Sequence, residues 1–166
     1  MKKLYPALAI VPIVGLCLAA GFRAHGSLNP QHGMSAGHKF VMPADLKWTA
    51  PPSLPRGAKM AIVEGDLTKP GSFAFRVMLP ANYRIPPHFH PADERVTVLK
   101  GTFYMGRGEK FNASAARALP AGGFTSMPAG MRHFAFSKQG CVVQVHGMGP
   151  WGITYVNPDD DPRKKK

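Results

Sequence analysis

The sequence predicts an all-β protein, folded as a sandwich or barrel with at most one short helix. Glycine (18) and proline (17) are frequent among the 166 residues. They separate short runs of β-branched and aromatic residues, as turns separate strands. A chain of this length indicates one domain with a single sizeable core.

The predicted strands follow one another at short spacing. They are Lys59–Val63, Ser72–Leu79, Glu94–Leu99, Thr102–Met105, Phe124–Met127, Arg132–Phe136, Cys141–Val145 and Gly152–Val156. Only Asn112–Leu119 has helical character, because it is rich in alanine and begins with an asparagine that can cap a helix. We therefore predict a barrel domain over residues 48–158.

Residues 1–24 have the pattern of a secretory signal peptide, with two lysines before an apolar run and small residues after it. An uncleaved membrane anchor is the alternative, because the run is about long enough to span a bilayer. Two prolines and a glycine within it disfavour a spanning helix. We expect export to the periplasm or the exterior, with no membrane span left after cleavage.

The remaining segments are a flexible leader over residues 25–47, rich in Gly, Pro, Ser and His, and a charged tail over residues 159–166. The formal net charge is +12, but the basic residues are scattered, which disfavours nucleic-acid binding. Cys17 lies in the predicted signal peptide. Cys141 is then left without a disulfide partner, and we expect it to be a buried thiol.

The stretch from Pro86 to Gly101 carries a candidate site. His88 and His90 share one face of an extended strand. Glu94 shares a face with two valines, and a carboxylate on an inward, apolar face is costly unless it is paired or binds a cation. Nitrogen and oxygen donors in this arrangement favour a divalent metal. Surface histidines in a proline-flanked loop are the alternative.

A fourth ligand is expected on a neighbouring strand, and His133 is the best candidate. It follows a Pro-x-Gly turn and shares a strand face with the small Ala135, which leaves room beside a bound ion. Taken alone, His133 is better interpreted as an ordinary core histidine than as a ligand.

At this point the chain resembles the cupins, whose two motifs are written G-x5-H-x-H-x3,4-E-x6-G and G-x5-P-x-G-x2-H-x3-N. The matching residues are His88, His90, Glu94 and Gly101 in the first motif, and Gly122, Pro128, Gly130 and His133 in the second. Asn82 replaces the first glycine and Ser137 the last asparagine. The resemblance covers about Lys59 to Val156.

This resemblance implies a double-stranded β-helix, the jelly-roll barrel, with one metal ion held by His88, His90, Glu94 and His133. Three imidazoles and a carboxylate suit Fe, Mn, Ni, Cu, Co or Zn, and the sequence does not choose among them. The resemblance to cupins also implies a homodimer formed through edge strands.

We expect an exported metal-binding protein that acts as an oxidoreductase of dioxygenase type on a small organic substrate. A non-catalytic module that binds or senses a small molecule is the alternative, so the sequence leaves open whether the protein is an enzyme. Candidate residues of the substrate pocket are Arg76, Tyr104, Gln144 and His146. For each of them a solvated or satisfied position on the outer face is at least as consistent with the strand pattern.

Overall fold

The structure is a computed structural model and describes residues 38–164. Residues 39–166 form one compact unit, and the description below is confined to its described part. The predicted signal peptide and residues 25–37 of the predicted leader lie outside the described residues. Within residues 38–164, no helix is long and apolar enough to cross a membrane.

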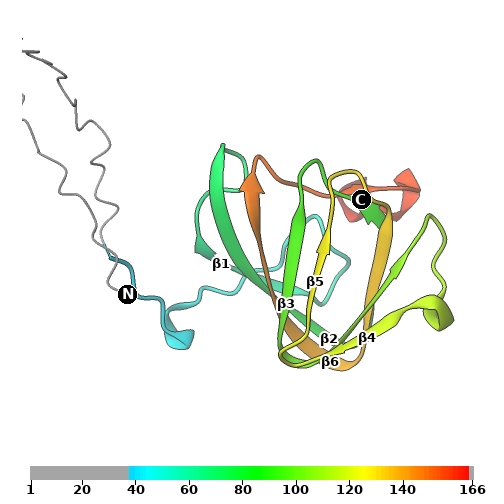
Figure 1. Cartoon of the computed structure of the whole chain (residues 1–166), viewed down its shortest axis with the longest axis horizontal. Helices are drawn as coiled ribbons and strands as arrows, with labels where there is room; N and C mark the ends of the chain where they lie inside the picture. Colours follow the sequence, from blue (N-terminus) through cyan, green and yellow to red (C-terminus); the bar gives the residue numbers. More distant parts are fainter. Residues whose placement is uncertain (1–37, 165–166) are drawn as a thin grey trace, which may run out of the picture. The chain divides into compact units, whose positions relative to one another are not determined.

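Seven antiparallel strands make up the unit (Figure 1). They are β1 (Lys59–Glu64), β2 (Gly71–Phe89), β3 (Glu94–Arg107), β4 (Arg117–Pro120), β5 (Phe124–Met127), β6 (His133–Gly149) and β7 (Thr154–Tyr155). Their order is β1-β2-β6-β3-β4, with β5 also pairing with β3 and β7 also pairing with β2.

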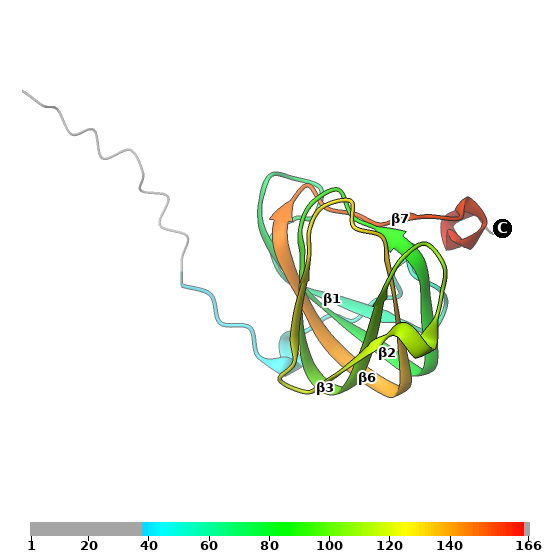
Figure 2. The same ribbon diagram turned by 45° about the vertical axis from the view of Figure 1, so that its right-hand side comes forward.

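The three long strands β2, β3 and β6 each take part in both walls of a barrel. β1 pairs with the first half of β2, whereas β7 pairs with its end at His88 and Phe89. In the same way, β5 pairs with the start of β3 and β4 with its second half. Figure 2 shows the strands wrapped around a common interior. The predicted all-β jelly-roll barrel is therefore confirmed.

Two of the breaks predicted between strands lie inside these long strands. Asn82 has a left-handed φ of 55° within β2, and Gly101 has a φ of 75° within β3. A Cβ added to Gly101 would lie 2.3 Å from the backbone oxygen of Gly140. Only glycine fits this backbone angle and this close approach, and the strands continue past both positions.

The predicted helical segment is a single 3₁₀ turn, Ala113–Ala115, followed by β4. Asn112 does cap it, because its side-chain oxygen accepts a hydrogen bond of 3.1 Å from the amide of Ser114. The prediction that a helix extends to Leu119 is wrong, since the second half of β3 pairs with these residues as a strand. Three more 3₁₀ turns are Pro43–Asp45, Pro158–Asp160 and Pro162–Lys164.

The core lies inside the barrel and is built by alternation along the strands. Phe75, Val77, Val143 and Val145 are buried, whereas their chain neighbours face outward and are less buried. Cys141 is also buried and unpaired, as predicted, and burial raises the pKa of its thiol. The interior is thus apolar up to the point where the histidines enter it.

Candidate metal centre

The three predicted histidines meet at one end of the barrel interior. His88 on β2 lies opposite His133 on β6 in the strand register, and His90 follows the last residue of β2. One ligating atom from each of the three lies within 4.8 Å of the others. Strand periodicity explains the arrangement of His88 and His90, because residues two apart point to the same side.

Each imidazole is held by a hydrogen bond from its Nδ1 atom to a backbone carbonyl. The acceptors are Pro86 for His88 (2.7 Å), Gly152 for His90 (2.6 Å) and Met131 for His133 (2.9 Å). A carbonyl only accepts, so Nδ1 must carry the proton, and Nε2 of each neutral ring is left with a free lone pair. Metal-binding histidines are oriented by hydrogen bonds of this kind.

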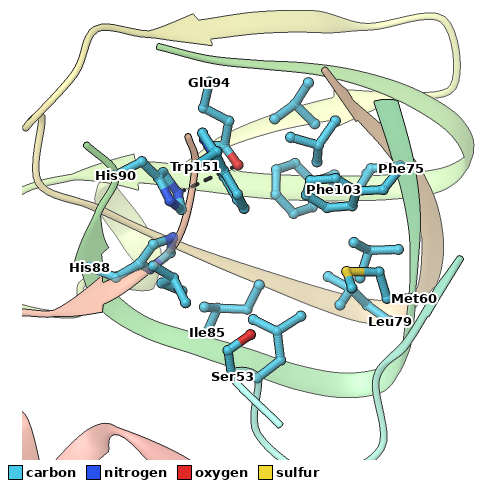
Figure 3. A pocket seen from close by; sticks show the side chains of 16 residues that line it. Ser53, Met60, Phe75, Leu79, Ile85, His88, His90, Glu94, Phe103 and Trp151 are labelled. Carbon is cyan, nitrogen blue, oxygen red and sulfur yellow. Dashed lines mark ion pairs between the residues drawn. The ribbon is translucent and has the colours of Figure 1, made fainter. Parts of the chain in front are cut away.

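Glu94, the first residue of β3, lies beside two of the imidazoles. One of its carboxylate oxygens lies 3.5 Å from Nε2 of His90, and the other lies 3.3 Å from Nε2 of His133. Its side chain points into the same cavity as His88 and His90 (Figure 3). The inward orientation expected from its alternation with the valines is therefore observed.

Burial sets the electrostatics of these groups. His88 is 3% exposed and His133 only 1%. Burial, together with the neighbouring His133 and His90, holds the pKa of His88 well below its usual value. Burial also lowers the pKa of His90, against the opposing effect of Glu94. Both rings are consequently neutral near pH 7, the form in which imidazole binds a metal.

The donor atoms lack partners within the described residues. Nε2 of His90, Nε2 of His133 and one oxygen of Glu94 are buried without a hydrogen bond. Buried polar atoms are normally satisfied, so several unsatisfied acceptors facing one another are best explained by a cation between them. Neutral imidazoles and a carboxylate are the donors that divalent transition metals take, and the three buried histidines could hold such an ion.

The cavity beside these donors extends into the apolar core (Figure 3). About 60 Å³ of it is open to the centres of water-sized molecules. Its polar side chains other than Trp151 are Ser53, His88, His90 and Glu94, and its walls are otherwise formed by aliphatic and aromatic residues. Among the described residues, no lysine, arginine, asparagine or glutamine lines this cavity. It is therefore suited to a small ligand with an apolar body.

The structure does not bring the four predicted pocket residues to this cavity. Arg76, Gln144 and His146 alternate with Phe75, Val143 and Val145, which do line it. Arg76 instead donates a hydrogen bond of 3.1 Å to Gln144 on the outer side of the sheet. The outer-face alternative is the correct one for these side chains, because neighbours along a strand point to opposite faces.

Tyr104 is likewise outside the cavity, next to Phe103, which lines it. Its ring stacks on Phe136 with centroids 4.7 Å apart, and Lys138 lies over its face. The placement of Tyr104 in a substrate pocket is therefore not supported by the structure.

Trp151 lines the cavity and was not predicted to do so. Its indole stacks on the imidazole of His90, with ring centroids 4.2 Å apart and planes inclined by 18°. The sequence signal was an aromatic residue directly after the Gly149–Pro150 turn, on the segment that closes the barrel. That position alone does not distinguish a barrel cap from a wall of the site.

A segment before the first strand also covers the cavity, through Ser53 and Leu54. Two buried tyrosines hold this segment in place. The hydroxyl of Tyr155 donates a hydrogen bond of 2.8 Å to the backbone oxygen of Ser53, and that of Tyr83 donates to Pro55. Burial raises the pKa of both hydroxyls, so they remain protonated donors at ordinary pH.

Comparison with solved structures identifies this architecture as that of the cupins. The polyketide cyclase RemF from Streptomyces resistomycificus is similar over 77% of this chain and 92% of its own, with 19% identity and a TM-score of 0.60. A candidate acetylacetone dioxygenase from Methylibium petroleiphilum is similar over 76% of this chain and 85% of its own, with 19% identity and a TM-score of 0.58.

An RmlC-like cupin from Ralstonia eutropha is similar over 75% of this chain and 76% of its own, with 16% identity and a TM-score of 0.58. At these identities the likeness establishes the fold alone. No curated protein matches the sequence.

A family model described as a domain of unknown function, DUF4437, matches residues 42–146. The matched range contains the whole candidate donor set, from His88 to His133, together with strands β1 to β5 and all but the last three residues of β6. The chain is therefore a cupin in fold and a member of the DUF4437 family.

Proposed function

We propose that this protein binds one divalent transition metal through His88, His90, His133 and Glu94, and that it acts on a small organic molecule in the adjoining cavity. The observation that carries this proposal is the set of buried acceptors without partners, which a cation would satisfy. Export from the cytoplasm remains part of the proposal, on the basis of residues 1–24 alone.

The reaction class that we favour is oxidoreduction of dioxygenase type. A redox-active metal bound here would supply the chemistry, and it would retain open coordination positions beside four protein ligands if it were octahedral. The neighbour described as a candidate acetylacetone dioxygenase supports this class by its fold and by the activity described for it. Fe, Mn, Ni, Cu, Co and Zn all remain compatible with the donor set.

The chain's own residues have three tasks in this proposal. The backbone carbonyls behind His88, His90 and His133 fix each ring with Nε2 toward the ion. Glu94 would offset part of the metal's charge, and its two oxygens lie 3.5 and 3.3 Å from Nε2 of His90 and His133. The apolar walls exclude water from the ligand, which strengthens every electrostatic interaction inside the cavity.

A non-catalytic cupin that binds a small molecule is the second candidate. The supporting observation is that residues 38–164 contribute no titratable side chain to the cavity wall apart from the proposed metal ligands. General acid–base chemistry would therefore depend on those ligands themselves. A small molecule that stabilises the protein against heat without being consumed would favour this candidate.

The test begins with elemental analysis of purified protein, loaded in turn with each of the six metals. We expect one metal ion per chain in the wild type and in His146→Ala, and a large loss in His133→Ala. Oxygen uptake with acetylacetone and other small ketones then tests the reaction class. Absence of stoichiometric binding for all six metals contradicts the metal site. A closed tetrahedral zinc with no exchangeable ligand contradicts the dioxygenase class.

A further inference from the structure

Trp151 packs against the candidate metal centre. Its backbone amide donates a hydrogen bond of 2.7 Å to the carbonyl of Leu67. Phe73 and Phe75 pack against the indole, at centroid distances of 5.5 and 5.2 Å, and His90 stacks on it. The ring is therefore packed from several sides and forms part of the cavity wall.

The indole N–H of Trp151 has no acceptor among the described residues. Its Nε1 atom is buried and makes no hydrogen bond. Tryptophan normally finds a partner for this group when it is buried, and an unpaired buried donor is unfavourable. Since the ring lines the cavity, the missing acceptor is best sought in whatever occupies that space.

The other polar groups of the cavity limit what this occupant can be. Apart from the proposed ligands, Ser53 is the only polar side chain of residues 38–164 that accompanies Trp151 in the wall. In the described part of the chain, no cationic side chain faces the cavity to receive a carboxylate or phosphate. Glu94 would repel such an anion in the absence of metal. The rest of the wall is apolar. The lining therefore favours an uncharged molecule with an oxygen acceptor and a hydrocarbon body.

The size of the cavity gives a further limit. Its roughly 60 Å³, measured for the centres of water-sized molecules, exceeds the roughly 10–15 Å³ that a single water requires by the same measure. A molecule of a few heavy atoms can be accommodated without moving the walls.

We propose that Trp151 is a ligand-positioning residue, whose indole N–H donates a hydrogen bond to the oxygen of a small, uncharged, largely apolar molecule such as a short ketone. The inference deepens the proposed function by naming its ligand class. It rests on that function in one respect only, namely that a bound metal would be a second point of contact for the ligand. The indole contact can be measured with or without metal.

The first measurement follows the indole N–H directly by two-dimensional ¹⁵N–¹H NMR. The chain has two tryptophans, so only Trp48 and Trp151 contribute indole signals, and Trp151→Phe assigns them. On titration of the zinc-loaded and the metal-free protein with 2-pentanone, we expect the Trp151 signal to shift and that of Trp48 to stay in place. Binding without a shift of the Trp151 signal overturns the proposal, as does the absence of binding in both forms.

The second measurement compares affinities. Trp151→Phe retains an aromatic ring against His90 but removes the N–H, and Trp48→Phe is the matched control away from the cavity. We expect Trp151→Phe to weaken 2-pentanone binding about three- to tenfold, the effect of one neutral hydrogen bond. Zinc affinity should stay within about twofold of wild type, and Trp48→Phe should change neither affinity. Equal ketone binding by Trp151→Phe and wild type contradicts the positioning role.

The third measurement tests the charge of the ligand. Butanoate has nearly the shape of 2-pentanone but carries a carboxylate. In metal-free protein we expect it to bind at least tenfold more weakly than the ketone, and equal or tighter binding contradicts the inferred ligand class. If no metal binds but the ketone still shifts the Trp151 signal, the metal function fails and the indole contact stands. If metal binds and the signal does not respond, only the present inference fails.

Discussion

The imidazole of His90 and the indole of Trp151 lie nearly parallel, with ring centroids 4.2 Å apart. Trp151 is thus an optical reporter in contact with a proposed metal ligand. In a Trp48→Phe background, where Trp151 is the remaining tryptophan, we expect Cu(II), Ni(II) or Co(II) to quench the fluorescence strongly at one equivalent. An ion with an open d shell this close to the ring accepts its excitation.

The controls for this experiment come from the same chain. Zn(II), with its filled d shell, should bind without comparable quenching. Trp151→Phe, which leaves only Trp48 to fluoresce, should respond little to any of the ions. Strong quenching of Trp48 alone would show that the metal binds elsewhere.

His133 and His146 lie on the same strand and provide a matched pair of variants. His133 is buried with an unpaired Nε2 beside Glu94, whereas His146 alternates with cavity-lining valines and faces away. We expect His133→Ala to lower metal affinity by more than the roughly 10–100-fold that follows loss of a residue supporting a metal ligand. His146→Ala should remain within a few-fold of wild type. Metal affinity is measured by competition with a chelator, and equal effects of the two substitutions would remove His133 from the site.

Tyr155 links the closing segment of the barrel to the segment that covers the cavity, through its hydrogen bond to Ser53. Tyr155→Phe deletes this bond with little change of volume and should lower the free energy of unfolding by about 1 kcal/mol. Tyr104→Phe is the control, because the hydroxyl of Tyr104 has no hydrogen-bond partner in the described part of the chain. The measurement is urea denaturation of both variants, with amide exchange to locate the loosened residues. Unchanged exchange around residue 53 would contradict this anchoring.

Asp161 and Arg163 form an ion pair that makes stability depend on pH. Arg163 donates two hydrogen bonds of 2.8 Å to the carboxylate of Asp161 and one of 3.0 Å to the backbone oxygen of Ile153. These bonds from Arg163 lower the pKa of Asp161 below its usual value of 3.8. The stabilisation is therefore fully present above pH 3.8 and is lost as the pH falls through the lower pKa of the folded protein.

The variant Asp161→Asn tests this directly. We expect a lower melting temperature than wild type at pH 7 and a difference that shrinks as the pH falls below about 4. Asp159→Asn, at an exposed neighbouring position, should have little effect at either pH. A difference between Asp161→Asn and wild type that is constant from pH 7 to pH 2.5 would rule out the ion pair as its cause.

The sequence alone was sufficient to predict the fold class and the side of the strand to which the main site residues point. Alternation of Glu94 with Val96 and Val98 correctly predicts that all three point inward, because the two-residue period of a strand is a local property. For the same reason, the two-residue spacing of His88 and His90 predicts that their side chains lie on the same face of the strand. Their approach to His133 could be inferred only from the resemblance to cupins, since the pairing of β2 with β6 joins segments distant in sequence.

Other features depended on tertiary context that local patterns do not contain. Asn112–Leu119 has the composition of a helix, but pairing with β3 makes its second half a strand. Arg76 and Gln144 could not be assigned to a face without the register, which places their apolar neighbours inside. Trp151 was missed because the segment that carries it is irregular and has no period to read.

The hydrogen bond from His90 to Gly152 spans 62 residues and comes from the last part of the barrel to be made. The imidazole of His90 is therefore not oriented by this bond until the chain has been made beyond Trp151 and the segment that carries Gly152 has packed against the barrel. If the metal binds as proposed, ribosome-bound chains that stop short of Gly152 should be poor acceptors for it. Metal uptake would then mark completion of the fold, and a released chain would be able to select its ion in the compartment where it finishes folding.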